Sequence, residues 1–272
     1  MLTSRILAFG LCFFFLVSNL SGQNDSLQTI RGVESAATQL GVSDSKMIDL
    51  LMPVMPGVGS NGRDLLNEQT VKPYMMPPRK LGRGGSLYAY SLASLLEFYV
   101  NFDQNFKDNL SPDYISLSTE NKGLEEAFKF LALNGTVSAA IMPYDASAIS
   151  SAVFATQKYK IANYLHIFRD VTNGRQKVFE TRKALMRGNP VMVEMLVSED
   201  FFNLNGASFW RSLGKKAETP VTLLVVSYDQ DLEAFELYGT WGKEWGSNGY
   251  LWVDYEDFGK FAQNGFVIVP KK

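Results

Sequence analysis

The sequence predicts an α+β fold in which a mainly helical half comes first and a sheet follows it. Residues 87–100 are apolar on nearly every side, with only Ser91, Ser94 and Glu97 polar. This pattern is typical of a helix buried at the centre of a domain. After residue 190, short β-branched or aromatic runs alternate with turn residues, which indicates an antiparallel sheet or a small barrel.

Spacing and capping residues predict the other elements of the first half. In residues 27–40 apolar residues recur at steps of three and four, which marks one face of a helix. A short helix over residues 47–52 can begin at Ser43 or Asp44 as its N-cap. Residues 53–83 are rich in Pro, Gly and Asn and show no sustained period, so we expect an extended crossing segment.

One more helix and five strands complete the predicted elements. A helix over residues 124–133 is followed by Asn134 and Gly135, which are usual residues at a helix C-terminus. The predicted strands are residues 191–197, 221–228, 234–238, 250–255 and 266–269.

Residues 1–22 have the pattern of an export signal, with Arg5 before an apolar core over residues 6–17. We expect cleavage before Gln23 and a bacterial protein that is periplasmic, associated with the outer membrane, or extracellular. The alternative is an uncleaved N-terminal anchor. No later segment reaches the length of a membrane span, so we expect no direct membrane insertion after cleavage.

Composition excludes several classes of function. The 272 residues are 46% hydrophobic and 20% charged, with a net charge of -2, which offers no field for nucleic acid. The single cysteine, Cys12, lies in the predicted signal, and His166 is the single histidine, so we expect neither a disulfide nor a metal site. The Gly-x-Gly-x-x-Gly at Gly57, Gly59 and Gly62 opens no helical pattern, so we expect no cofactor.

Two motifs carry a family resemblance. Residues 81–91 read Leu-Gly-Arg-Gly-Gly-Ser-Leu-Tyr-Ala-Tyr-Ser, and residues 239–250 read Gly-Thr-Trp-Gly-Lys-Glu-Trp-Gly-Ser-Asn-Gly-Tyr. Between them come Leu-Ser-Pro-Asp-Tyr at residues 110–114 and Gly-Asn-Pro-Val at residues 188–191. In order and spacing these segments resemble the papain-like cysteine peptidases, over about residues 73–270.

The resemblance implies a papain-like fold of two lobes, a helical lobe plus an antiparallel β-barrel-like lobe with a cleft between them. It divides the chain into the signal at 1–22, an N-terminal helical or extended segment at 23–72, the helical lobe at 73–158 and the β lobe at 159–272. The family's cysteines that staple the helical lobe are absent from this sequence. We therefore expect the fold to be held by core packing alone.

Position by position, the resemblance places other residues where the family has its catalytic groups. The nucleophilic cysteine falls on Leu87, the general-base histidine on Val221, the orienting asparagine on Gly239 and the oxyanion glutamine on Leu81. These side chains supply no thiolate, imidazole or amide donor. The resemblance therefore predicts that the chain is not an enzyme but a degenerate pseudopeptidase.

The same alignment predicts a binding role for the cleft. The floor would be apolar, and the expected binding-cleft residues are Ser86, Tyr88, Lys122, Gly123, Trp241 and Trp245. For the two tryptophans, a role in the core is the first interpretation, and a role as aromatic anchors for a partner is the second. The predicted function is an exported, non-catalytic module that binds a protein or peptide.

Two alternatives remain open. The chain could be a structural or accessory subunit of a larger bacterial envelope complex, with a membrane-protein complex as partner. It could also be a hydrolase with a relocated nucleophile, Ser86, for which His166 is the sole candidate base. Against this, we expect Ser86 to cap the central helix and His166 to lie at a surface or interface.

Overall fold

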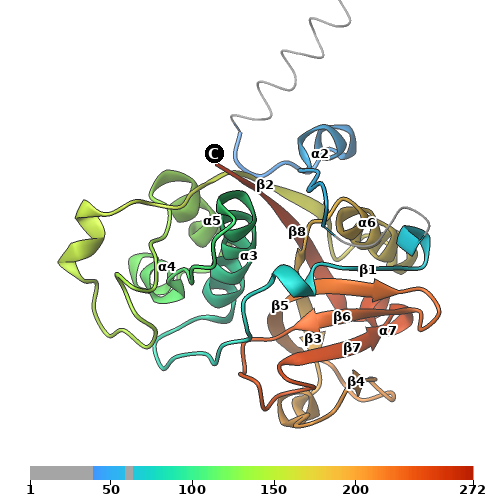
Figure 1. Cartoon of the computed structure of the whole chain (residues 1–272). Helices are drawn as coiled ribbons and strands as arrows, with labels where there is room; N and C mark the ends of the chain where they lie inside the picture. The colour runs from blue at the N-terminus through green and yellow to red at the C-terminus, as the bar shows by residue number, and fades with distance from the viewer. Residues whose placement is uncertain (1–38, 59–63, 272) are drawn as a thin grey trace, which may run out of the picture.

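The computed structural model of the chain describes residues 39–58 and 64–271 (Figure 1). The predicted signal at residues 1–22, Cys12, Gly59, Gly62 and nearly all of the helix predicted at residues 27–40 lie outside the described residues. The α-helices in the described part are α2 (Ser45–Leu51), α3 (Leu87–Gln104), α4 (Pro112–Ser118), α5 (Leu124–Leu133), α6 (Gly174–Met186) and α7 (Tyr255–Phe261). None of these helices is long and apolar enough to cross a membrane.

The strands form one eight-stranded sheet among the described residues. They are β1 (Glu68–Thr70), β2 (Ile161–Phe168), β3 (Val191–Val197), β4 (Phe209–Trp210), β5 (Thr219–Asp229), β6 (Ala234–Tyr238), β7 (Tyr250–Asp254) and β8 (Ala262–Pro270). The order is β2-β8-β3-β5-β6-β7-β4, and β1 also pairs with β5. All pairs are antiparallel except β4 with β7, so the predicted α+β class with a mainly antiparallel sheet is confirmed.

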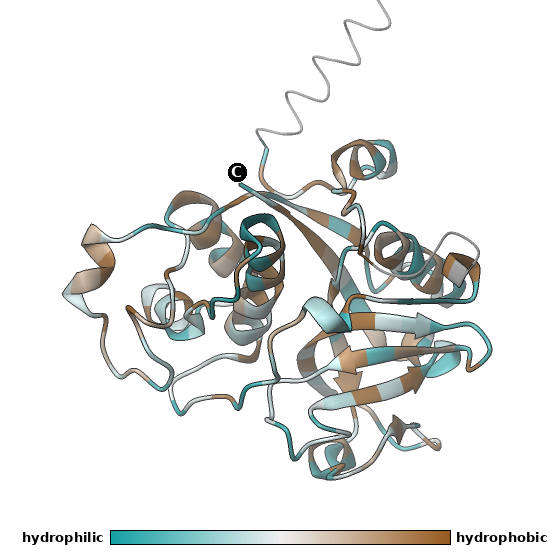
Figure 2. Ribbon diagram, in the orientation of Figure 1, coloured by the Kyte–Doolittle hydropathy of each residue, from teal (hydrophilic) through white to brown (hydrophobic). Residues whose placement is uncertain are grey.

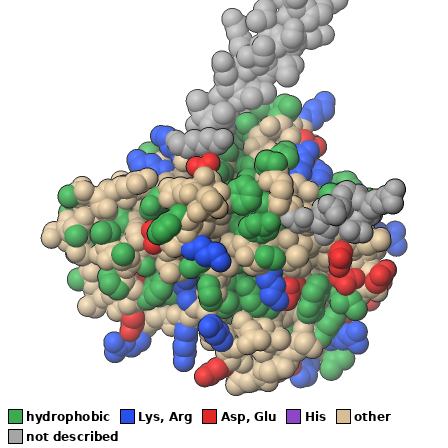
Figure 3. All heavy atoms as spheres, in the orientation of Figure 1, with side chains coloured by type: hydrophobic (Ala, Val, Ile, Leu, Met, Phe, Trp, Pro, Cys, Tyr) green, Lys and Arg blue, Asp and Glu red, His purple; other side chains and the backbone are tan. Residues whose placement is uncertain are grey.

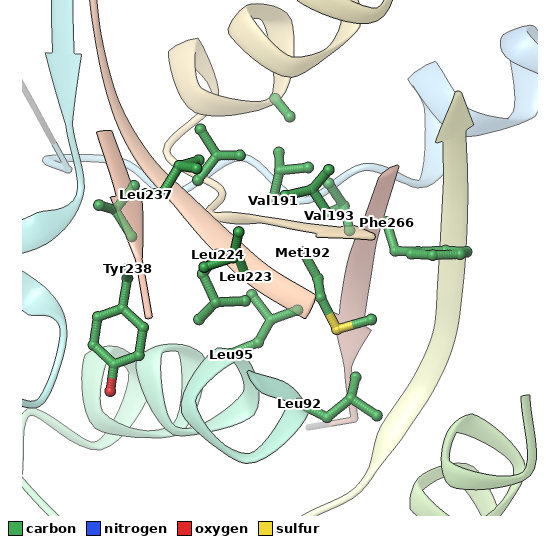
Figure 4. Packing of buried hydrophobic residues seen from close by; sticks show 14 of the residues in the cluster. Leu92, Leu95, Val191, Met192, Val193, Leu223, Leu224, Leu237, Tyr238 and Phe266 are labelled. Carbon is green, nitrogen blue, oxygen red and sulfur yellow. The ribbon is translucent and has the colours of Figure 1, made fainter. Parts of the chain in front are cut away.

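The central helix α3 packs against one face of the sheet. Twelve of its 18 residues are buried, including both Leu92 and Leu95. Leu92 and Leu95 lie against Met192 of β3 and Leu224 of β5 (Figure 4). The α6 helix contacts three of the strands that α3 contacts, β3, β5 and β8, and in Figure 4 it lies across the sheet from α3. The sheet is therefore buried between helices, and hydrophobic residues colour its central strands and α3 in Figure 2.

The elements with strong local signals lie where the sequence predicts them. The helix at residues 124–133 and the strands at 191–197 and 234–238 have the predicted bounds. The short helix α2 begins after Asp44, whose carboxylate accepts a hydrogen bond from the Met47 N–H at 3.0 Å. Asp44, rather than Ser43, is therefore the N-cap.

Three helices were missed by the sequence analysis. The α4 and α7 helices have seven residues each, which is too short for a clear period. The α6 helix has 13 residues but buries only four of them, so charged residues dominate its pattern. Within the predicted extended segment, β1 pairs with β5 at the register Gln69↔Tyr228.

The expectation that core packing alone holds the fold is wrong, because a buried ion pair joins the crossing segment to α3. The Arg79 guanidinium pairs with the Glu97 carboxylate, and both side chains are more than nine-tenths buried. Arg79 Nη1 also donates to the Leu110 carbonyl at 3.1 Å, and the Leu110 N–H donates to Glu97 Oε2 at 2.7 Å. Three segments of the helical half are thus tied together by polar contacts.

Candidate functional site

The turn before α3 is fixed by polar side chains from distant segments. The Gly82 N–H donates to the Tyr90 hydroxyl at 3.0 Å, and that hydroxyl donates to Asp113 Oδ1 at 3.0 Å. Burial raises the pKa of Tyr90 to about 12, so its hydroxyl keeps the proton that it donates. The Arg83 N–H donates to Asp145 Oδ1 at 2.8 Å. The turn is therefore held in one conformation just ahead of the helix.

Ser86 occupies the N-cap position of α3 but does not cap it with its side chain. Its hydroxyl lies 3.3 Å from the Ser116 hydroxyl, and its N–H donates to Ser116 Oγ at 3.2 Å. The expected side-chain cap is wrong, because Ser116 of α4 offers this hydroxyl another partner. The α3 helix therefore starts without a side-chain acceptor on its first N–H groups.

His166 has partners of its own on the sheet. Its Nε2 lies 3.0 Å from Asn264 Oδ1, and the Asn264 amide donates to Glu194 Oε2 at 2.8 Å. Since that amide nitrogen donates to Glu194, the Asn264 oxygen is the group left to accept from His166. The hydrogen bonds of Ser86 and His166 therefore go to different residues, and the structure does not pair them as nucleophile and base.

Two of the predicted binding residues, Tyr88 and Gly123, meet beside the start of α3. Leu87 is the first residue of the helix and is half-buried. The hydroxyl of the next residue, Tyr88, accepts a hydrogen bond from the Gly123 N–H at 3.2 Å. Gly123 has a φ of +114°, which favours glycine, and a Cβ there would meet nothing within 4 Å. Lys122 is exposed and pairs with Glu120 at 2.9 Å.

Leu81 and Gly239 are brought close by the backbone. The Leu81 N–H donates to the Thr240 carbonyl at 2.8 Å. A Cβ on Gly239 would lie 2.6 Å from the Trp245 ring and 2.8 Å from the Trp241 ring. The two indoles thus fill the space that a side chain at this position would need, so the glycine is required by packing.

The two predicted tryptophans differ in their surroundings. Trp245 is 2% exposed, and its Nε1 donates to the Phe201 carbonyl at 2.8 Å. Trp241 is half-buried, with its ring centre 4.8 Å from that of Trp245 and 5.8 Å from that of Phe202. Trp245 is thus a core residue, while Trp241 presents part of its ring to solvent.

Val221 lies within the sheet near the second turn of α3. It is 2% exposed and pairs with Met195 of β3. The Ser91 hydroxyl of α3 donates to the carbonyl of the next residue, Thr222, at 3.2 Å. This contact joins β5 to the helix that begins at Leu87.

Sequence reasoning missed several residues that shape this surface. The Asn121 amide donates to the Gly84 carbonyl at 3.3 Å, and Asp145 forms an ion pair with Arg83 at 3.3 Å. Ser116 holds the backbone of Ser86. These partners lie 30 to 62 residues from the turn in sequence, so no local spacing could have identified them.

Together these contacts place a set of half-buried apolar side chains at the start of the central helix. Leu81, Leu87 and Trp241 are half-buried and come from the crossing segment, α3 and the residues after β6. The bond from the Leu81 N–H to the Thr240 carbonyl joins the first and third of these segments, and Leu87 begins the helix that follows the first. Gly84 offers open space beside them. The arrangement can bury an apolar side chain of a ligand next to accessible backbone groups.

The family model of the papain family cysteine proteases matches residues 67–265, which is more than half of the chain. The chain belongs to the papain family. Its fold is similar to that of xylellain, a cysteine protease from Xylella fastidiosa, with a TM-score of 0.61 and 18% identity. That match covers 87% of this chain and 97% of xylellain. The papain-like fold that the sequence predicts is therefore confirmed.

The curated relatives are longer than the part of them that matches this chain. A cysteine proteinase of Theileria parva is 25% identical over 183 residues, which is 64% of this chain and 40% of that protein. Cathepsin K of Mus musculus is 27% identical over 191 residues, which is 66% of this chain and 56% of that protein. The chain thus spans about half the length of these relatives.

These comparisons contradict the expectation that the chain is not an enzyme. The family and the relatives named above are cysteine proteases, and nothing in the fold itself marks degeneration. The expectation rested on transferring four roles to Leu81, Leu87, Val221 and Gly239 by resemblance. A shared fold at this level of identity does not fix which side chains react, so that transfer was too strict.

Proposed function

We propose that this papain-family protein binds an extended protein or peptide segment at the start of α3. The observation that carries the proposal is the half-buried apolar set of Leu81, Leu87 and Trp241 beside an open glycine backbone. Large apolar and aromatic side chains that are partly exposed and rigidly held are common anchors for a peptide side chain.

Hydrogen bonds hold the surface at the start of α3 in one conformation, which supports a role for that surface in binding a peptide. The Gly82 to Tyr90 and Leu81 to Thr240 contacts hold the two edges of the surface without a ligand. A surface that is already ordered loses little conformational entropy when it binds. An extended segment could pass over Gly84 and Gly123, where an added Cβ would meet no atom within 4 Å.

A peptide array followed by calorimetric titration tests this proposal. We expect Leu87→Arg to weaken binding of the selected peptides at least tenfold, because a charge replaces the apolar anchor. Trp241→Ala should weaken the same peptides without introducing a charge. The matched control is Leu232→Arg, at a 53% exposed leucine in the β5–β6 turn. Equal affinities in Leu87→Arg, Trp241→Ala and the control would contradict the proposal.

The same mixtures report on peptide hydrolysis. Mass spectrometry of the recovered peptides distinguishes intact from shortened products. Leu87→Arg and Ser86→Ala then show which residues any cleavage depends on, once Ser86→Ala has been titrated with the same peptides.

We also propose that the protein is exported from a bacterial cell and acts in the periplasm, at the outer membrane or outside the cell. The basic, apolar and small residues before Gln23 support this. Expression with the native N-terminus followed by N-terminal sequencing of the exported protein tests it, and the expected first residue is Gln23. A cytoplasmic product that still begins at Met1 would contradict it.

A further inference from the structure

A hollow of about 1020 Å³ lies at the C-terminal half of α3, away from the site at the start of that helix. An 18-residue helix is about 27 Å long, so Leu87 and the hollow occupy opposite ends of it. The floor is apolar and comes from three elements: the segment after α2, α3 and the end of β8. It includes Leu51, Val54, Leu96, Val100, Phe102 and Val269.

Part of this floor is largely exposed to solvent. Val54 is 68% exposed. A second hollow of about 400 Å³ shares Phe102 with the first and adds Phe106, which is 64% exposed. In Figure 3, hydrophobic side chains gather on the face between α3 and α2. The two hollows therefore adjoin at Phe102.

The rim of this surface is basic although the chain as a whole is acidic. Lys158, Lys160 and Lys271 line the first hollow, and among the residues that the structure describes Asp103 is the one acidic residue that lines it. Lys107 lines the second hollow. The chain has a net charge of -2. Cations are thus concentrated around this apolar floor against the overall balance.

The lysine ammonium groups are held in place with donors to spare. Lys160 Nζ donates to the Leu133 carbonyl at 2.6 Å, and Lys158 Nζ donates to the Val153 carbonyl. An ammonium has three donors, so neither lysine uses all of its donors in these hydrogen bonds. The Lys158 ammonium also lies over the Tyr114 ring, 4.7 Å from its centre. Burial, together with the charge of Lys160, lowers the pKa of Lys158. An anion placed between the two lysines would relieve this mutual repulsion.

We propose that the hollow binds an acidic amphipathic segment of a partner protein, with its apolar face on the floor and its carboxylates against the lysines. An apolar groove with a rim of one charge fits a helix whose apolar residues recur at steps of three and four. Complementary charge would fix the orientation of the segment and raise its association rate. This site uses none of the residues of the proposed peptide site.

Calorimetric titration with designed peptides tests the proposal on the whole exported chain. The probe is an 18-residue helical peptide with leucine on one face and glutamate elsewhere, compared with the same peptide carrying lysine for glutamate and with a scrambled acidic peptide. We expect saturable binding of the acidic amphipathic peptide, at least tenfold tighter than that of the other two. No binding, or equal binding of all three peptides, would overturn the proposal.

Variants locate the binding. We expect at least a tenfold loss in Lys158→Glu combined with Lys160→Glu, and also in Val54→Asp, which changes an exposed side chain and should not disturb folding. Leu232→Asp is the matched control and should bind as the unchanged chain does. Leu87→Arg should also leave binding unchanged. A loss in Leu87→Arg with no loss in Val54→Asp would place the peptide at the other site and overturn this proposal.

Two further measurements exclude other occupants. Light scattering over a range of concentrations should show a mass that is the same in the unchanged chain and in Val54→Asp. A dimer that Val54→Asp abolishes would assign the hollow to a second copy of this chain. Tighter binding to vesicles of anionic phospholipid than to the acidic peptide would assign it to a membrane surface. Either result overturns the proposal.

Discussion

The helical half and the sheet half of this protein are held together by different forces. In the sheet half, backbone ladders join the strands, and the main hydrophobic cluster spans the sheet and the sides of α3 and α5 that face it. In the helical half, a separate cluster has only four buried hydrophobic residues, Tyr114, Val137, Met142 and Val153. Its loops are also fixed by polar pairs, of which three are buried, Arg79–Glu97, Tyr90–Asp113 and Thr136–Ser111. A fourth pair, Asn101–Asp108, is partly buried.

The difference shows how polar side-chain contacts can hold the loops of the helical half in place without disulfides. Arg79–Glu97 and Asn101–Asp108 join α3 to a loop. Tyr90–Asp113 joins α3 to α4, and Thr136–Ser111 joins a loop to the N-cap residue of α4. Removing one partner leaves the other buried and unsatisfied, which costs more than the pair itself contributes. The helical half should therefore be sensitive to loss of polar groups, and the sheet half to changes of volume.

The largest effect is expected from Arg79→Leu. This change leaves the Glu97 carboxylate buried without its cation, and we expect a loss of about 3–5 kcal/mol in the free energy of unfolding. Burial already raises the pKa of Glu97. Without Arg79 that pKa rises further, so the deficit relative to the unchanged protein should shrink as pH falls and the carboxyl group takes up a proton. Urea denaturation at pH 7.5 and 5 measures both effects.

The matched control for this change is Arg83→Leu. Arg83 is 93% exposed in its ion pair with Asp145, and an exposed pair contributes about 0–1 kcal/mol. A loss in Arg83→Leu as large as that in Arg79→Leu would break the comparison, since it would show that burial does not set the strength of the polar contacts.

A smaller effect is expected in the sheet half from Gly239→Ala. The new Cβ would lie within 3 Å of both Trp241 and Trp245, so at least one indole must move. Overpacking of this kind costs about 1–3 kcal/mol, and the change in tryptophan fluorescence should accompany the loss of stability. The control is Gly84→Ala, where a Cβ meets nothing within 4 Å, and its stability should stay within about 0.5 kcal/mol. Equal stability of the two variants would contradict the packing argument.

The elements that the sequence predicted correctly are those with strong local signals. Helix 124–133 has an apolar face and a clear end, and the strands of the second half are β-branched runs between turns. The apolar run at residues 87–100 also predicted the first residue of α3, Leu87. Such features depend on residues close together in the chain, so they can be recognised without a structure.

The contacts that shape the candidate site could not be predicted in this way. Ser86 has the residue type and position of an N-cap, yet a hydroxyl 30 residues away engages its side chain. Arg79 and Glu97 have no spacing that marks them as partners, because one lies in the crossing segment. The basic hollow at the end of α3 likewise combines four segments that are far apart in sequence. These features depend on tertiary packing, which sequence periodicity does not report.

The smallest effect is expected where the two halves meet, at His166. Its ring stacks on Phe266 at 4.5 Å, and Phe266 lies 5.4 Å from Phe128 of α5. Burial lowers the pKa of His166, and the hydrogen bond to Asn264 opposes this only in part. The unfolded chain therefore takes up this proton at a higher pH than the folded chain. Stability linked to His166 should be complete above about pH 6.5 and should fall as pH drops through the lowered pKa.

The variant His166→Gln isolates this contribution, because glutamine can still donate to Asn264 but does not titrate. Thermal unfolding between pH 7.5 and 5 should show a steeper loss for the unchanged protein than for the variant. The groups whose charges act on the ring, Arg169 and Asp170, are present in both proteins and cancel in the difference. Identical pH slopes would mean that the ring is as accessible to protons in the folded state as in the unfolded one. In that case the contact between α5 and the sheet would open more readily than the rest of either half.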